Sequence, residues 1–219
     1  MLVTAHGGSF GTGRNTEKYF QTIKDYNVDI IEVDIWKRGD LLYISHLPRL
    51  FPKLWTLPLS YVFEFVKEHR FKVNCDVKQG GLVKPVTELA RSYGVEDLIL
   101  FIGSVKPFEI KDVTNEVWLN RSFFGMSPVC ENVGKMKARI ESYGKSNIKG
   151  INFNYKYLSD EFLKRCTEAD LAVSAFTVDD EKEQERLINY PVIANLTSNM
   201  PDVTLKLLNK EIKRKKVKK

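Results

Sequence analysis

The stretch IIEVDIWK at residues 30–37 decides the fold prediction for this chain. Ile31, Val33 and Ile35 alternate with Glu32 and Asp34, so the two sets of side chains leave opposite faces of an extended segment. Apolar alternation over this length is typical of a β-strand. If the apolar face packs under helices, both carboxylates point into the interior of a sheet or barrel. Buried carboxylates need a cation or a lysine nearby, because an unpaired buried charge is unfavourable.

Short β-rich runs and helical patterns alternate on both sides of this stretch. Further strands are predicted at residues 2–6, 72–78, 97–103, 116–122, 150–155, 171–178 and 192–197, with a hairpin arm at 41–46. Helices are predicted at residues 15–26, 59–69, 83–93, 107–113, 129–143, 159–169 and 180–189, and from Pro201 onward. Eight such units indicate an α/β protein that forms a compact (β/α)8 TIM barrel. A doubly wound open sheet is the structural alternative.

The chain reads as one domain followed by a basic tail. No linker, low-complexity region or fixed-period repeat divides residues 1–209, which carry no net charge. The net charge of +6 belongs to residues 210–219, which hold seven Lys or Arg side chains and one Glu. A solvated, fraying helix end is the expected form of this tail. The alternative is weak contact with an anionic membrane; the neutral body argues against a nucleic-acid partner.

Composition excludes several classes of protein. Hydrophobic residues make up 43% of the chain and charged residues 28%, as in ordinary globular proteins. No apolar run reaches the length of a membrane-spanning helix, and the first residues lack the basic region of a signal peptide. Three well-separated cysteines, with no Cys-x-x-Cys pair, indicate a reducing compartment. We therefore expect a cytoplasmic protein.

Six polar residues of the first three strands form the candidate site, since function sits at the carboxyl ends of barrel strands. They are His6, Glu32, Asp34, His46, Asp76 and Lys78. Three carboxylates suit Mg²⁺ or Ca²⁺, two imidazoles can act as general acid and base, and a lysine can bind phosphate or stabilise a charged transition state. Together they suit displacement at phosphorus. Each residue alone is a weak signal, and His69, at a helix end, is interpreted as structural.

Several motifs together resemble the glycerophosphodiester phosphodiesterase family. They are AHGG at 5–8, RNT at 14–16, DIIEVDI at 29–35, ISH at 44–46, NCDVK at 74–78, AFTVDDEKEQERLI at 175–188 and NLTSNMPD at 195–202. The resemblance covers nearly the whole chain, and the first 78 residues carry its specific part. It implies a (β/α)8 barrel that uses a divalent metal to hydrolyse glycerophosphodiesters to glycerol 3-phosphate and an alcohol, in glycerol and lipid metabolism.

The resemblance also implies a role for each matched residue. Metal ligands would be Glu32, Asp34 and Asp76; the phosphate contact would be Lys78; the acid–base pair would be His6 and His46. A glycerol hydroxyl would attack phosphorus, and water would then open the cyclic phosphate that forms.

The sequence departs from the family pattern at four places. The family's His-Arg-Gly is His6-Gly7-Gly8 here, and we expect Arg14, on the same loop, to replace the lost arginine as a substrate contact. The third metal ligand is an aspartate instead of a glutamate. The family's histidine–aspartate pair is His46-Leu47, and the insertion after it is reduced to residues 47–72.

Three groups of residues leave alternatives open. Phe51, Leu54, Trp55 and Leu57 could contact a lipid tail or cap the barrel, and the cap is favoured. Phe176 is a candidate substrate-binding residue or a core aromatic. Other candidate ligand contacts near strand ends are Asn120, Arg121, Asn152, Asn154 and Thr177.

Three functions are compatible with these features. The first is a metal-dependent phosphodiesterase acting on a glycerophosphodiester or a related small phosphodiester. The second is a catalytically impaired barrel that binds a phosphorylated ligand, favoured by the missing arginine and the short insertion. The third is a binding module that acts through its basic tail.

Overall fold

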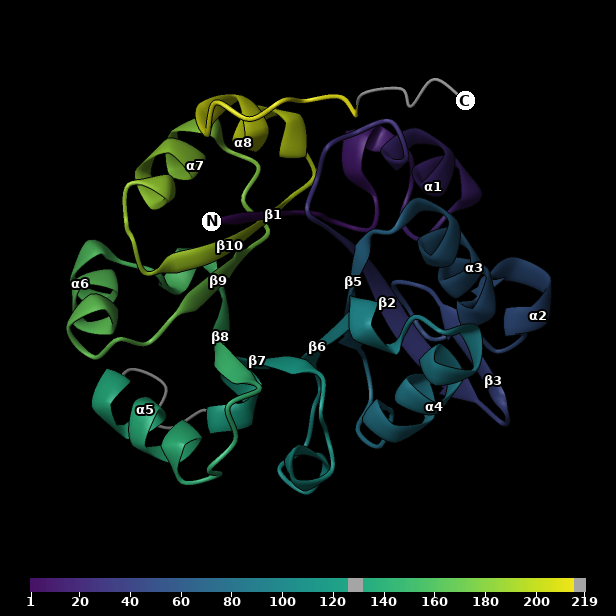
Figure 1. Ribbon diagram of the computed structural model, residues 1–219, viewed down its shortest axis with the longest axis horizontal. Coiled ribbons are helices and arrows are strands. Elements are labelled where there is room, and N and C mark those ends of the chain that lie inside the picture. Colours follow the sequence, from purple (N-terminus) through teal and green to yellow (C-terminus); the bar gives the residue numbers. More distant parts are fainter. Residues whose placement is uncertain (126–131, 215–219) are drawn as a thin grey trace.

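The computed structural model describes residues 1–125 and 132–214, and Figure 1 shows their strands arranged in a ring. The ring strands are β1 (Leu2–Ala5), β2 (Ile30–Arg38), β5 (Lys72–Val77), β6 (Ile99–Gly103), β7 (Glu116–Asn120), β8 (Ile148–Asn154), β9 (Val173–Phe176) and β10 (Ile193–Ser198). Each pairs in parallel with its neighbours, and β1 pairs with both β10 and β2. The ring is therefore closed, which confirms the predicted (β/α)8 barrel and excludes the open sheet.

Helices surround the ring (Figure 1). They are α1 (Glu17–Ile23), α3 (Leu59–His69), α4 (Val83–Tyr93), α5 (Val133–Glu141), α6 (Asp160–Glu168), α7 (Glu181–Ile188) and α8 (Pro201–Leu207). A short 3-10 turn, η3 (Glu109–Lys111), joins β6 to β7 where only a short helix was expected. Others are η1 (Ser9–Gly11), η2 (Glu96–Leu98), η4 (Arg121–Phe124) and η6 (Tyr155–Tyr157).

Local chemistry fixes where several helices begin. The side chains of Thr16, Asn132, Ser159 and Asp180 accept hydrogen bonds from the first turns of α1, α5, α6 and α7. The helix expected over residues 129–143 therefore begins at Val133, and residues 129–131 lie outside the described residues. The helix expected from residue 15 begins at Glu17, because Asn15 adopts a positive φ of 57°.

The apolar core lies between the ring and the helices. The alternating side chains Ile31, Val33 and Ile35 of β2 are fully buried in it, as their pattern predicted. A smaller apolar cluster lies on the other face of the strands and includes Ile102 and Trp118. Of the three cysteines, Cys75 and Cys166 are buried and unpaired, and Cys130 lies outside the described residues.

Strand β2 extends beyond the ring into the expected hairpin. Its last residues pair antiparallel with β3 (Leu41–Ile44) across a turn in which Gly39 has a φ of 58°. The short helix α2 (Pro52–Trp55) follows, and β4 (Leu57–Pro58) returns to pair with β3. The whole excursion is brief, which agrees with the reduced insertion predicted from the sequence.

The expectation that this insertion caps the barrel is wrong. Phe51, Leu54 and Trp55 are 61%, 72% and 74% exposed, and none of them lines the cavity at the end of the barrel. Leu57 packs against the core instead. Figure 1 shows β3 and α2 outside the ring of strands.

The C-terminal segment docks onto the barrel as far as residue 214. Helix α8 ends at Leu207, and the Lys210 ammonium then lies 3.0 Å from the Asp29 carboxylate. Arg214 donates to the carbonyl of His69 at 2.8 Å and stacks over the Phe71 ring. For residues 210–214 the expected solvated helix end is therefore wrong.

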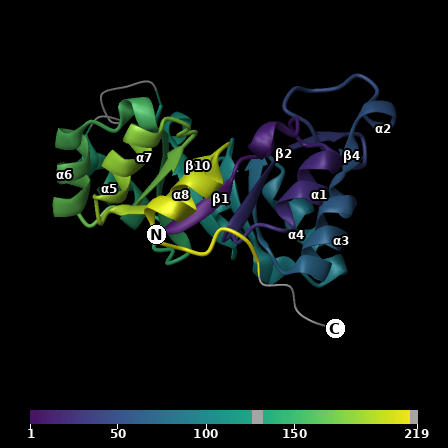
Figure 2. The same ribbon diagram turned by 90° about the horizontal axis from the view of Figure 1, so that it is seen from above.

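Asp29 and Phe71 directly precede β2 and β5, so this contact lies at the amino-terminal end of the barrel. Figure 2 shows the C-terminal segment and α2 on opposite sides of the molecule. Within residues 1–125 and 132–214, no helix is long and apolar enough to span a membrane.

Truncation tests whether the docked segment contributes to stability. A chain ending at Asn209 should lose about 1–3 kcal/mol of unfolding free energy relative to one ending at Arg214, because it lacks the ion pair, the hydrogen bond and the cation–π contact. Urea unfolding of both chains measures the difference. Equal midpoints would mean that these contacts contribute nothing.

Candidate active site

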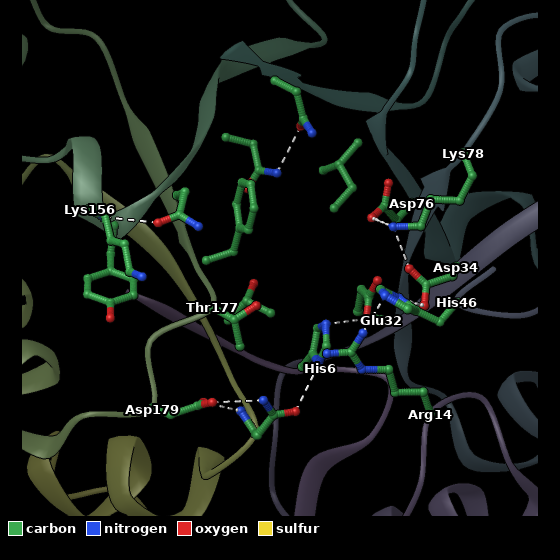
Figure 3. A pocket seen from close by; sticks show the side chains of 18 residues that line it. His6, Arg14, Glu32, Asp34, His46, Asp76, Lys78, Lys156, Thr177 and Asp179 are labelled. Atoms are coloured by element: carbon green, nitrogen blue, oxygen red, sulfur yellow. Dashed lines mark hydrogen bonds and ion pairs between the residues drawn. The ribbon is translucent and has the colours of Figure 1, made fainter. Parts of the chain in front are cut away.

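A cavity of about 420 Å³ opens at the carboxyl ends of the strands, where polar side chains converge (Figure 3). Every site residue predicted from the sequence lines it: His6, Arg14, Glu32, Asp34, His46, Asp76, Lys78 and Phe176. Thr177, Asn120, Asn152 and Asn154 line it as well. Arg121 does not, because its guanidinium lies over the Tyr157 ring.

Three carboxylates, two of them buried and one half-buried, meet on one wall of the cavity. Glu32 and Asp34 are 2% and 1% exposed, and each of them and Asp76 offers an oxygen within 4.8 Å of the others. Strand register explains the juxtaposition, since Asp34 of β2 lies directly opposite Asp76 of β5. Burial, together with the charges of Asp34 and Asp76, raises the pKa of Glu32 well above its ordinary value.

Lys78 supplies the compensating charge. Its ammonium lies 2.5 Å from an oxygen of Asp34 and 2.5 Å from an oxygen of Asp76. Burial lowers the pKa of Lys78, but the neighbouring carboxylates outweigh it and raise the pKa above the ordinary lysine value. Lys78 therefore carries its positive charge at neutral pH and divides its hydrogen bonds between two of the three acids.

Backbone and loop residues hold the carboxylates in place. The Gly7 amide donates to Glu32 at 2.7 Å, and the Asn15 side chain donates to Asp34 at 2.8 Å. Asn15 also accepts from the Asp34 backbone amide at 3.1 Å, so one side chain fixes both ends of that residue. A Cβ at position 7 would lie 3.0 Å from the Glu32 carbonyl, which leaves little room for a side chain at that position.

His6 is oriented by two residues that the sequence analysis did not assign. Its Nδ1 lies 2.8 Å from the side-chain oxygen of Asn199, whose amide nitrogen donates to Asp179 at 2.8 Å. Because Asp179 uses the amide N–H of Asn199, the Asn199 oxygen accepts from Nδ1–H of His6. In the neutral ring Nε2 then carries the lone pair, 3.9 Å from Glu32. Burial lowers the pKa of His6 below its ordinary value.

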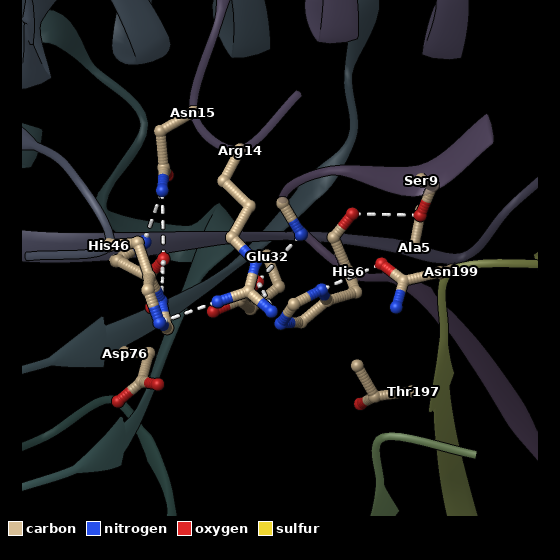
Figure 4. Close-up of polar contacts among 12 residues, drawn as sticks. Ala5, His6, Ser9, Arg14, Asn15, Glu32, His46, Asp76, Thr197 and Asn199 are labelled. Atoms are coloured by element: carbon tan, nitrogen blue, oxygen red, sulfur yellow. Dashed lines mark hydrogen bonds and ion pairs between the residues drawn. The ribbon is translucent and has the colours of Figure 1, made fainter. Parts of the chain in front are cut away.

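His46 and Arg14 form the exposed side of the site. Arg14 Nη1 lies 2.5 Å from Nε2 of His46, while Nδ1 of His46 lies 3.5 Å from Asp34. Arginine has only donors, so Nε2 of His46 is the acceptor in this contact. Figure 4 shows the Arg14 guanidinium between the two imidazoles.

The opposite wall is built from amides, a lysine and an aromatic ring. Asn152 donates to Asn120 at 2.9 Å, and Lys156 and Phe176 complete the wall. Phe176 is half-buried and lines the cavity, so it is not a buried core aromatic, and its contact with substrate stays a prediction. Lys156 was not predicted, because it lies in η6 beyond the end of β8 and belongs to no quoted motif.

Comparison with known proteins confirms the fold. No protein-family model and no curated protein matches this sequence. Three solved structures illustrate the likeness. A protein of Agrobacterium tumefaciens with the provisional name glycerophosphoryl diester phosphodiesterase has a TM-score of 0.80 at 12% identity, covering 95% of this chain and 97% of its own.

Two further structures agree. An Oleispira antarctica phosphodiesterase in complex with its product, sn-glycerol-3-phosphate, has a TM-score of 0.73 at 17% identity, covering 95% and 97% of the two chains. A Thermotoga maritima glycerophosphodiester phosphodiesterase has a TM-score of 0.67 at 15% identity, covering 94% and 98%. The names of all three structures agree with the family that the sequence motifs resemble. At identities this low, the likeness shows a shared fold.

Gly103, at the end of β6, provides a test of the acidic cluster. A Cβ there would lie 2.1 Å from an oxygen of Asp76, and the φ of 90° disfavours any side chain. Gly103→Ala should therefore displace Asp76 and destabilise the fold by about 2–3 kcal/mol or more in urea unfolding.

Gly94→Ala is the matched control, since φ is 70° there but no atom lies within 4 Å of the added Cβ. It should lose only about 1 kcal/mol, from backbone strain. Equal losses in the two variants would show that Gly103 does not make room for Asp76.

Proposed function

We propose that this protein is a metal-dependent phosphodiesterase that hydrolyses a glycerophosphodiester or a related small phosphodiester. The observation that carries the proposal is the convergence, in one cavity, of three carboxylates, a lysine and two imidazoles. The fold is shared with structures named as glycerophosphodiester phosphodiesterases, one of which binds sn-glycerol-3-phosphate. A cytoplasmic location agrees with the unpaired, buried Cys75 and Cys166.

Glu32, Asp34 and Asp76 are the proposed ligands of Mg²⁺ or Ca²⁺. Their oxygens are hard donors, they lie within 4.8 Å of one another, and Lys78 balances only part of their charge. The residues therefore fit a divalent cation. When bound, such an ion withdraws charge from phosphate oxygens and helps to orient the substrate. Lys78 is the proposed contact for the phosphate, because its ammonium lies beside the carboxylates that would hold the metal ion.

The two histidines are the proposed proton carriers. His6, with its lone pair on Nε2, takes the proton of a glycerol hydroxyl as that oxygen attacks phosphorus. His46 protonates the alcohol oxygen as its bond to phosphorus breaks, leaving a cyclic phosphate. Water then opens the ring with the two roles reversed. Asn199 and Asp179 act as positioning residues, because they fix the tautomer of His6.

Arg14 is the proposed second phosphate contact. In the described structure its guanidinium occupies Nε2 of His46, so it must move before His46 can carry a proton there. A phosphate bound between the lysine and the arginine offers the guanidinium a bidentate partner in exchange. The alternative, a barrel that binds a phosphorylated ligand without turnover, would keep this contact and lose the proton transfers.

Removal of the metal should abolish the activity. Hydrolysis of glycerophosphocholine should require Mg²⁺ or Ca²⁺ and stop with EDTA. Independently of activity, saturating metal should stabilise the protein by about 2.7 kcal/mol at a hundred times Kd, measured as a rise in melting temperature of several degrees. Asp76→Asn should lose this rise, whereas Asp112→Asn, at an exposed carboxylate outside the cavity, should retain it. Full activity in EDTA would contradict the metal assignment.

Alanine at either site histidine should lower kcat by about 10²–10⁴-fold, the usual contribution of general acid–base catalysis. The matched control is His69→Ala, since His69 packs against Phe65 outside the cavity. Glycerol 3-(p-nitrophenyl phosphate) separates the roles, because its leaving group hardly needs a proton. His46→Ala should lose less on this substrate than on glycerophosphocholine, whereas His6→Ala should lose equally on both. A barrel that only binds ligand would show no turnover to lose.

Arg14→Ala should reduce kcat/KM for glycerophosphocholine by about 10–100-fold, the value of a hydrogen bond to a charged group. Arg14→Lys keeps the charge but not the paired donors, so it should restore part of the loss. Steady-state kinetics on the three proteins measures this. Unchanged turnover in Arg14→Ala would remove Arg14 from the substrate site.

A further inference from the structure

Residues 47–55 form an exposed apolar surface, here called the 47–55 segment. Five of its nine residues are large apolar side chains, each between 60% and 74% exposed: Leu47, Leu50, Phe51, Leu54 and Trp55. Elsewhere in residues 1–125 and 132–214, exposed large hydrophobics are scattered: Phe108, Tyr157, Met200 and Ile212. A concentration of this kind marks an interaction site.

The backbone of the segment is held while its side chains face outward. Pro52 is buried, and its carbonyl accepts from both the amide and the hydroxyl of Thr56. The Arg49 amide donates to the Tyr43 hydroxyl, which is itself buried against the hairpin. The apolar side chains are thus displayed from a hydrogen-bonded frame.

The charges of this surface are all positive. Arg49 and Lys53 are exposed within the segment, and the sequence has no acidic residue between Asp40 and Glu64. Leucines, aromatic rings and cations on one surface match the boundary of an anionic bilayer, where apolar groups enter the acyl region and cations meet the headgroups. An exposed tryptophan is suited to that boundary.

The segment also has the right position. It begins directly after His46, at the end of the barrel where the cavity opens, whereas residues 210–214 dock at the opposite end. Figure 2 shows α2 and the C-terminal segment on opposite sides. A membrane bound at the segment would face the cavity mouth, whereas one bound through the C-terminal residues would face the other end of the barrel.

We infer that the 47–55 segment binds the surface of an anionic phospholipid bilayer and turns the cavity mouth toward the lipid headgroups. The inference goes beyond phosphodiester hydrolysis, because the contact does not involve the residues of the cavity. It also differs from a membrane contact through the basic tail.

Vesicle flotation tests the inference. The vesicles contain phosphatidylcholine with roughly a third phosphatidylglycerol, so that the surface is anionic. Wild-type protein should float with them, and Leu54→Ser/Trp55→Ser should bind on the order of tenfold more weakly, since two apolar anchors are lost. Phe108→Ser, the matched removal of one exposed aromatic ring outside the segment, should float like wild type. Failure of wild type to bind, or undiminished binding of the double variant, would overturn the inference.

Tryptophan fluorescence locates the contact. Trp55 is the exposed member of three tryptophans, since Trp118 is buried and Trp36 is half-buried. Vesicles should shift the emission to shorter wavelength in wild type. Trp55→Phe should remove the shift while retaining flotation, because phenylalanine is still an apolar anchor. A shift that persists in Trp55→Phe would place the contact elsewhere and overturn the inference.

Two further measurements separate the competing occupants. A chain ending at Arg214 should float like wild type, and loss of flotation would transfer the contact to the tail. Sedimentation velocity without lipid should show no concentration-dependent dimer that Leu54→Ser/Trp55→Ser abolishes. Such a dimer would assign the segment to a second copy of the chain and overturn the lipid contact.

Failure of the inference and failure of the proposed function are distinguishable. Flotation needs no hydrolysis, so vesicle binding by a protein inactive on glycerophosphocholine would leave the inference standing alone. Conversely, Leu54→Ser/Trp55→Ser should hydrolyse soluble glycerophosphocholine at the wild-type rate. Normal hydrolysis without vesicle binding in wild type would overturn only the membrane contact.

Discussion

The arrangement of the site depends on two ion pairs, which the Lys78 ammonium forms with the carboxylates of Asp34 and Asp76. Three acids converge in the wall of one cavity, two of them almost fully buried, and their mutual repulsion opposes burial. One fixed cation relieves part of that repulsion and leaves a surplus of negative charge. This excess of negative charge is unfavourable when no further cation is bound, and it gives the cluster its affinity for a divalent cation.

These ion pairs exist because two parallel strands pair in one register. Asp34 lies opposite Asp76, and Lys78 follows two residues later on the same face. A slip of β5 by one residue would turn Asp76 and Lys78 toward the helices and bring apolar side chains of β5 into the cavity. Apolar alternation on the outer face of β2 therefore protects the chemistry on the inner face. The register that buries the apolar side chains of β2 and β5 is therefore also the register that brings the carboxylates together.

The loops at the carboxyl ends convert this cluster into an oriented site. Asn15 holds Asp34 from the first loop, and Asn199 with Asp179 holds His6 from the last two. The ring closure between β1 and β10 brings these distant segments together. The two ends of the barrel differ: residues 210–214 dock at one end, and the other end carries the cavity and the exposed 47–55 segment.

The sequence alone determined the strand–helix alternation, the inward direction of Glu32 and Asp34, and the six polar residues at the ends of the first strands. Each follows from a local period or from a residue at a strand end, and local patterns survive folding because the backbone sets side-chain direction. Asn199 and Asp179 could not be assigned this way, since Asn199 meets His6 from the far end of the chain and Asp179 acts through Asn199. Lys156 was missed because it lies in η6, beyond the end of β8.

Tertiary structure alone decided three further points. It showed Arg14 against His46, residues 210–214 docked instead of frayed, and the aromatic residues of the insertion exposed instead of capping the barrel. All three points concern which parts of the chain contact each other. The hydrophobicity of a residue predicts how favourable its burial is, but it does not predict which residues it will pack against. That choice is made by the closure of the barrel, which fixes the distances between segments that the sequence leaves free.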